Sequence, residues 1–274
     1  MRVVAAVPCH RDEPGVARTL ADLSDNVSHL DGARIVVCIN GPGAKTSPAA
    51  AAVAEVPGVE ARFIEQASKP AAWNLLRSEP ADVTVFSDAD VRIEPGSIAA
   101  LVDALEENPD AVLATASQRP DAVESAAARV ATVPFKLEWG GVAGTLYAAR
   151  TEWLPQMPDD VVLDDAWLWA AANAMGEGCI VRVPEAVATF RPASRWRDLW
   201  RQRLRAEAGK RQLRSWNLET APAPKASRPS AATLRAYRPT EFPAVAALAG
   251  IKLAASVWSR LRQPDWGTAP TTKA

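Results

Sequence analysis

Val83-Thr84-Val85-Phe86-Ser87-Asp88-Ala89-Asp90 is an apolar run that ends in two carboxylates separated by one small residue. Its β-favouring residues predict a buried strand, and open α/β sheets bind ligands at the carboxyl ends of such strands. If the segment is extended, Asp88 and Asp90 share a side and could bind one Mg²⁺ or Mn²⁺ together with phosphate oxygens. Aspartate is also common in turns and helix caps, so the rest of the chain must decide between a metal site and a turn.

The first 117 residues alternate between strand-like and helix-like patterns. Strands are predicted over residues 3–7, 34–39, 59–64, 83–86 and 111–115. Helices are predicted from Pro14 to Leu23 and after Pro95-Gly96-Ser97, because apolar residues recur there on one helical face. Strands separated by single helices pair in parallel through right-handed crossovers, which predicts an α/β fold with a doubly wound, mostly parallel sheet flanked by helices.

Composition limits the classes of protein that this chain can be. Its 274 residues, 48% of them hydrophobic, suffice for one large α/β domain with an elaborated end. A net charge of −1 argues against a nucleic-acid partner. Cys9, Cys38 and Cys179 are widely spaced and odd in number, so we expect buried free thiols and a reducing cytoplasm. The first apolar stretch is too short for a signal peptide and is predicted to be the first strand.

Polar side chains gather in the loops at the predicted carboxyl edge of the sheet. His10 could stack on a base, Asp12 or Glu13 could accept ribose hydroxyls, Asn40 could pair with a base edge, and Lys69 could meet a phosphate. Each has a structural alternative. Asp12 could cap the helix at Pro14, Asn40 and the following glycine could form a turn, and Lys69 could be solvated.

The second half has two charged helical segments. Asp164 and Asp165 precede a helix-forming run over residues 166–175, where at most one carboxylate points into a site and a pure capping role is the alternative. Residues 194–215 predict a helix with an apolar stripe and a basic remainder, made of Arg195, Arg197, Arg201, Arg203, Arg205, Lys210, Arg211 and Arg214. Arginine forks suit a diphosphate, with Arg203 and Arg205 first, whereas a solvated or membrane-facing surface is the alternative.

Seven segments in order resemble the family 2 glycosyltransferases of the GT-A fold, over roughly residues 1–215. "VPCHRDEPGVARTLADL", "VVCINGPG", "KPAAWN" and "FSDADVRIEPGSI" are similar to that family's nucleotide-sugar half. "GGVAGTLYAARTEWL", "LDDAWLWAA" and "RQRLRAEAGKRQL" are similar to its acceptor strand, catalytic-base motif and basic diphosphate-binding helix. The resemblance therefore implies a GT-A-type domain.

The resemblance also implies an activity: metal-dependent, inverting transfer of a sugar, from a UDP-sugar first, to a hydroxyl of an unknown lipid, saccharide or small-molecule acceptor. Asp165 is then the expected base and Asp164 the second choice. The implied nucleotide-sugar site consists of Pro8, His10, Asp12, Glu13, Asn40, Lys69, Asp88, Ala89, Gly141, Gly144, Gln202, Arg203 and Arg205. Two positions depart from the family. Asn40 stands where many members have Asp, and Ala206 stands where processive synthases have Trp, which indicates a non-processive enzyme.

Two other classes of function compete with this interpretation. A nucleotidyltransferase acting on a sugar phosphate would carry a glycine-rich basic loop after the first strand, but "PCHRDEP" follows here. A catalytically degenerate sugar-nucleotide-binding protein would have lost Asp165 or the carboxylate pair, and the chain keeps both. Glycosyl transfer therefore remains the favoured prediction.

The predicted organisation has four parts. Residues 1–217 form the GT-A domain, with a nucleotide-binding half over 1–117 and an acceptor half over 118–217; residues 218–240 form a Pro/Ala-rich linker, 241–262 a C-terminal helix and 263–274 a disordered tail. The apolar stretch from Pro243 to Trp258 is shorter than the ~20 residues that span a bilayer. It could dock on the domain, or lie peripherally in a membrane interface at the inner face.

Overall fold

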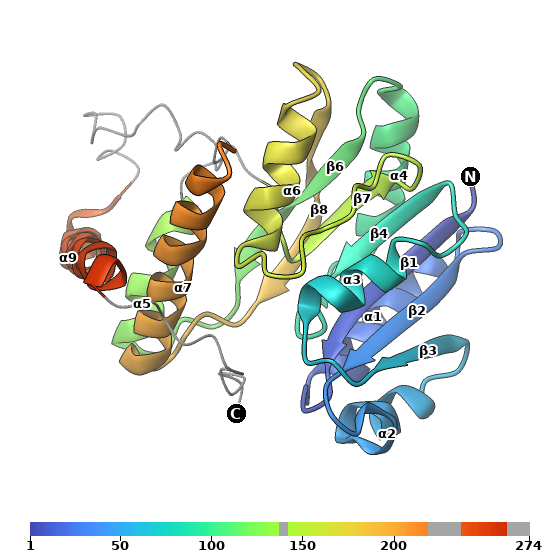
Figure 1. Ribbon diagram of the computed structural model, residues 1–274, viewed down its shortest axis with the longest axis horizontal. Coiled ribbons are helices and arrows are strands. Elements are labelled where there is room, and N and C mark those ends of the chain that lie inside the picture. The colour runs from blue at the N-terminus through green and yellow to red at the C-terminus, as the bar shows by residue number, and fades with distance from the viewer. Residues whose placement is uncertain (137–141, 219–236, 262–274) are drawn as a thin grey trace.

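The computed structural model describes residues 1–136, 142–218 and 237–261 of the chain. It contains an eight-stranded sheet with helices on both faces and a helical extension at one end (Figure 1). The strands are β1 Val3–His10, β2 Arg34–Asn40, β3 Val59–Ile64, β4 Val83–Ser87, β5 Arg92–Ile93, β6 Leu113–Pro120, β7 Leu146–Arg150 and β8 Ile180–Phe190. The α-helices are α1 Val16–Val27, α2 Pro48–Ala54, α3 Lys69–Leu76, α4 Ser97–Glu107, α5 Ala126–Thr132, α6 Asp164–Asn173, α7 Trp196–Ser215 and α9 Phe242–Leu261. Short 3₁₀ helices cover Ala44–Thr46, Val133–Lys136 and Pro239–Glu241.

The strands are ordered β3-β2-β1-β4-β7-β6-β8-β5 across the sheet. The first four are parallel neighbours, and Ala5 of β1 lies between Ile35 of β2 and Val85 of β4. β7 is antiparallel to both β4 and β6, so those two strands run in the same direction, and β6 pairs in parallel with β8. The doubly wound, mostly parallel sheet predicted from the sequence is therefore confirmed. The structure also contains an antiparallel strand, β7, between β4 and β6.

The two faces of the sheet bury separate apolar cores, because successive side chains of a strand point to opposite faces. On β1, Val3 and Ala5 pack with α1, α2 and α4, whereas Val4 and Ala6 pack with α3 and α6. Cys9, Cys38 and Cys179 are free and buried, as predicted.

Some predicted boundaries were wrong by a few residues. α1 begins at Val16 instead of Pro14, with Gly15 in the capping position. β1 continues as far as His10, and β6 starts at Leu113 and extends to Pro120. These shifts matter because they make polar residues at the ends of β1 and β6 part of the sheet edge.

The C-terminal extension packs beside the sheet domain at the end that carries α5 and α7 (Figure 1). Leu248 of α9 is buried with Leu199 of α7 and Val130 of α5, and the hydroxyl of Tyr237 donates a hydrogen bond of 3.1 Å to the carbonyl of Val133. Most of the predicted linker 218–240 and all of the predicted tail 263–274 lie outside the described residues.

Candidate functional site

A lysine joins three elements at the carboxyl edge of the sheet. Lys69 is the first residue of α3, and its Nζ lies 2.7 Å from Oδ1 of Asp88 and 2.6 Å from Oδ2 of Asp164. Burial alone would lower the pKa of Lys69, but the two carboxylates outweigh burial and raise it, so the group stays an ammonium. The solvated alternative for Lys69 was therefore wrong, and the side chain links the β4 turn to the start of α6.

Three stacked aromatic rings pack α3 against β4 and β7, next to Lys69 and Asp88. Trp73 of α3, Phe86 of β4 and Tyr147 of β7 stack with ring centroids 5.0 and 5.4 Å apart. The indole N–H of Trp73 donates to the Tyr147 hydroxyl at 2.7 Å, and the backbone N–H of Asp88 donates to the carbonyl of Thr145. Because these contacts fix α3 against β4 and β7, they hold Lys69 and Asp88 in position.

Asp164 and Asp165, at the start of α6, have different surroundings. Asp164 forms an ion pair with Lys69 through Oδ2, and Nη2 of Arg205 lies 3.7 Å from its Oδ1. Burial opposes ionisation of Asp164, but Lys69 and Arg205 outweigh burial, so its pKa falls below the ordinary value. Asp164 is therefore an ionised, fully engaged carboxylate and a weak base.

Asp165 is partly buried and more weakly held. Its Oδ1 accepts a hydrogen bond of 2.7 Å from the N–H of Ala166, and burial, together with the charge of Asp164, raises the pKa of Asp165 to about 6. A methyl group on Gly144 would lie 3.0 Å from Cβ and 3.4 Å from Oδ2 of Asp165, so the glycine leaves room for the carboxylate beside β7. A raised pKa makes Asp165 the stronger base of the pair.

The basic helix α7 contributes Arg205 to this cluster. Besides its contact with Asp164, Nε of Arg205 donates to the carbonyl of Val162 at 3.1 Å. Gly209 allows the approach, because a methyl group there would lie 2.4 Å from Cγ of Leu163 just before α6. We call Lys69, Asp88, Asp164, Asp165 and Arg205 the edge cluster.

The structure places Arg203 on another side of α7. Burial lowers the pKa of Arg203, and its charge lowers the pKa of Lys252 on α9. Residues two apart on a helix differ in direction by about 200°, which explains why Arg203 and Arg205 separate. Gln202 is exposed on the same helix.

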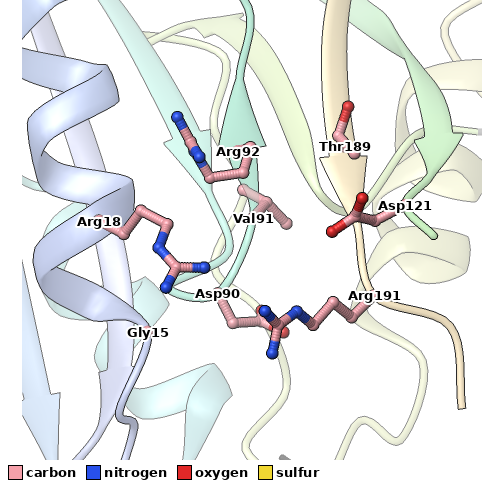
Figure 2. Close-up of a pocket in the computed structure, with 8 residues that line it drawn as sticks. All are labelled: Gly15, Arg18, Asp90, Val91, Arg92, Asp121, Thr189 and Arg191. Atoms are coloured by element: carbon pink, nitrogen blue, oxygen red, sulfur yellow. The ribbon is translucent and has the colours of Figure 1, made fainter. Parts of the chain in front are cut away.

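The two carboxylates after β4 do not share one extended segment. Asp88 follows the strand directly, but Ala89 and Asp90 form a turn, so the argument from alternating strand side chains was wrong. Asp90 lines a pocket that is partly open to solvent (Figure 2). The pocket is lined by Gly15, Arg18, Asp90, Val91, Arg92, Asp121, Thr189 and Arg191. Within residues 1–136, 142–218 and 237–261, no group of three or more His, Cys, Asp or Glu side chains could hold a metal alone.

The loop after β1 divides between structural and accessible side chains. Glu13 is 5% exposed and accepts a hydrogen bond from the N–H of Gly15, so Glu13, and not Asp12, closes the turn before α1. The buried amide of Asn40 donates to the carbonyl of Cys9 at 2.8 Å and ties β2 to β1. Pro8 is buried in β1, whereas the side chains of His10 and Asp12 are 35% and 55% exposed. Gly141 lies outside the described residues.

Arg18 and Arg191 line the pocket but were not among the site residues predicted from the sequence. Arg18 lies on α1 and Arg191 just after β8, and both line the pocket beside Asp90 (Figure 2). No local pattern relates residues so far apart, and the pairing of β8 with β5 and with β6 brings Arg191 near the turn.

Comparison with known proteins finds similarity in structure alone. No protein-family model matches the chain, and no curated protein matches its sequence. A mannosyltransferase from Pyrobaculum calidifontis, solved in complex with GDP-Man and Mn²⁺, is 19% identical with a TM-score of 0.59, covering 98% of this chain and 76% of that chain. Glucosyl-3-phosphoglycerate synthase from Mycobacterium tuberculosis, in complex with phosphoglyceric acid, is 17% identical with a TM-score of 0.55, covering 78% of each chain. TarS of S. aureus, residues 1–349 in complex with UDP-GlcNAc, is 13% identical with a TM-score of 0.51, covering 76% of this chain and 66% of that chain.

These similarities extend over most of the chain at low sequence identity, so they establish the architecture. The sheet order, the helices on both faces and the C-terminal helix agree with it. The chain therefore has the GT-A-type fold of these glycosyltransferases, as predicted from its sequence.

Proposed function

We propose that this protein transfers a sugar from a nucleotide-sugar donor to an acceptor hydroxyl, with inversion at the anomeric carbon. The observation that carries this proposal is the edge cluster, in which Lys69 joins Asp88 to Asp164 while the partly buried Asp165 beside them has a raised pKa. Structural neighbours in complex with GDP-Man and UDP-GlcNAc support a nucleotide-sugar donor. A UDP-sugar is the first donor to test, and GDP-Man is the second.

Asp165 acts as the general base in this proposal. An acceptor hydroxyl is a poor nucleophile at neutral pH, so its proton must pass to a nearby base as the oxygen attacks the anomeric carbon. Asp165 is suited to this step because its pKa of about 6 lies closer to neutrality than that of an ordinary carboxylate. Asp164 is less suited, since Lys69 and Arg205 already hold its charge.

Positive side chains balance the charge of the leaving group. As the new bond forms, the bond between the sugar and the diphosphate breaks, and its electron pair leaves with the diphosphate on the opposite face of the sugar. Arg205 can donate up to two hydrogen bonds in a fork that suits phosphate oxygens, and Lys69 supplies a point charge nearby. Both groups then stabilise charge that grows in the transition state.

Mg²⁺ or Mn²⁺ fits this site only when the nucleotide is also bound. Asp88 and Asp90 carry the oxygen ligands that these ions prefer, but Asp88 already shares the Lys69 ammonium with Asp164, and the described residues provide no complete metal shell. Diphosphate oxygens would have to complete the coordination. When bound, the ion would neutralise charge on the departing diphosphate.

Metal removal provides the first prediction. We expect a nucleoside diphosphate to bind on the order of 10- to 100-fold more tightly in Mn²⁺ than in EDTA, because Asp88, Asp90 and the diphosphate would together hold the ion, which would neutralise phosphate charge. Isothermal titration calorimetry measures this difference, and Asp88→Asn should remove most of it. Equal affinities in Mn²⁺ and EDTA would refute the metal assignment.

The pH dependence of the reaction provides the second prediction. Because the pKa of Asp165 is raised to about 6, the base is protonated below that pH, and kcat/KM should fall about tenfold for each further pH unit. The negative charge of Asp164 contributes to the raised pKa, so Asp164→Asn should move this fall to lower pH. A profile that stays flat down to pH 4.5 would show that Asp165 is not the base.

Thermal shift with a panel of sugar nucleotides in Mn²⁺ tests the proposed function itself. A ligand at about 100 times its Kd stabilises the folded state by about 2.7 kcal/mol, which is readily seen as a rise in Tm. We expect one nucleoside class to stabilise the protein, and stabilisation by none of them would overturn the proposal.

Two further features extend the proposal. Ala206, where a processive synthase has Trp, supports a single transfer to each acceptor. The three free buried thiols support a reducing cytoplasmic location.

A further inference from the structure

The outer face of α9 is apolar and exposed to solvent. Phe242, Leu253 and Val257 are 43%, 69% and 50% exposed, and their spacing places them on one side of the helix. The other exposed residues of this arc are also uncharged: Pro243, Ala246, Ala249, Gly250 and Ala254. We call this surface the α9 face.

The opposite side of α9 is attached to the protein. Leu248 and Ala255 are 4% and 0% exposed, and α9 lies against α5 and α7 at the edge of the molecule (Figure 1). By length and composition the helical segment Pro239–Arg260, which includes most of α9, could cross a membrane. Because one side is packed on α5 and α7, the helix is better placed to lie along an interface than to span a bilayer.

The exposed charges on the helices at this end of the molecule have one sign. On α5, α7 and α9, which the structure describes, every exposed charged residue is an arginine: Arg129, Arg197, Arg205, Arg214 and Arg260. Arg205 belongs to the edge cluster, which leaves the other four for a partner of these helices. Asp198 and Glu207 are only partly exposed. Arg260 follows Phe242 by five full helical turns, so it shares the apolar face, whereas the exposed Trp258 lies about 200° away from Arg260 around the helix. An arginine near the end of an apolar face suits the headgroup region of a bilayer.

We propose that the α9 face docks peripherally on a membrane surface that contains anionic lipids. Apolar side chains would enter the boundary between headgroups and acyl chains, while the arginines would meet lipid phosphates. A second copy of the chain fits the same face less well, because it would bring the same arginines into opposition. The proposal does not depend on the chemistry of the edge cluster.

Vesicle sedimentation of the full chain tests this docking. We expect the protein to sediment with vesicles of phosphatidylcholine and phosphatidylglycerol in equal parts, and less with phosphatidylcholine alone or in high salt. Leu253→Glu combined with Val257→Glu should weaken partitioning by about 100-fold, roughly tenfold for each side chain kept out of the membrane. Met175→Glu is the matched control, because Met175 is 54% exposed after α6 and should leave partitioning unchanged.

Leu253→Ser with Val257→Ser, an uncharged pair, should also weaken partitioning, which separates loss of apolar contact from charge repulsion. Thermal unfolding of each variant should match the wild type because both side chains are exposed. The proposal is overturned if the wild type binds neither vesicle, or if the double variants bind as well as the wild type. A dimer that the double variants abolish, without vesicle binding, would assign the face to a second copy instead.

Discussion

Replacing Asp165 by Asn is expected to lower turnover by about 10²–10⁴-fold while donor affinity stays close to that of the wild type. Asparagine keeps the size of the side chain but cannot accept the acceptor proton. Asp165 makes no ion pair with Lys69 or Arg205 among the described residues, so its loss should leave the cation arrangement of the edge cluster unchanged. Calorimetric titration with donor and initial rates with one active acceptor measure the two quantities separately.

Asp164→Asn is the matched variant for this prediction. It removes a neighbouring carboxylate of the same helix turn but leaves Asp165 able to accept a proton, so we expect a much smaller loss of turnover. Because Asp164 pairs with Lys69, its replacement should mainly weaken donor binding and stability. If Asp165→Asn turned over like the wild type, Asp165 would only support the start of α6.

Replacing Arg205 by Ala is expected to lower kcat by about 10²-fold and to weaken donor binding much less. Groups that stabilise charge developing on a leaving group contribute more to the transition state than to the bound substrate. Arg205 reaches Asp164 and is 53% exposed, so it remains accessible to a diphosphate. Initial rates at saturating donor, compared with donor affinity, measure the separation.

Arg203→Ala is the control on the same helix. Arg203 belongs to the α7 and α9 interface, so its replacement should alter stability more than kcat. An Arg205→Ala variant that changed donor affinity alone, or an Arg203→Ala variant with the larger loss of kcat, would count against the assignment.

The sequence predicted most of the sheet because buried parallel strands appear as continuous apolar runs. The residues of β3 were predicted without error, and β1, β2 and β4 within a few residues. The order of the strands across the sheet could not be predicted from such runs. β7 inserts between β4 and β6, which lie far apart in sequence, and no local pattern carries that pairing.

The candidate site was predicted as a set of residues but not as a set of contacts. Lys69, Asp88, Asp164 and Arg205 were all singled out, because charges at the ends of strands and helices are visible in a sequence. The sequence could not show that Lys69 pairs with two of those carboxylates, or that α9 covers the side of α7 that carries Arg203. Asp90 was predicted as a metal ligand because the segment from Asp88 to Asp90 was expected to be extended, but Ala89 and Asp90 form a turn.

Release of nucleoside diphosphate from a bound sugar nucleotide tests the proposed transfer most directly. The wild type and Asp165→Asn are incubated with the donor that gives the largest thermal shift, in Mn²⁺ at pH 7.5, with and without candidate hydroxyl acceptors. The proposal predicts release by the wild type and slower release by Asp165→Asn, by about 10²–10⁴-fold. Equal rates from the two proteins, or no release from a donor that binds, would contradict it.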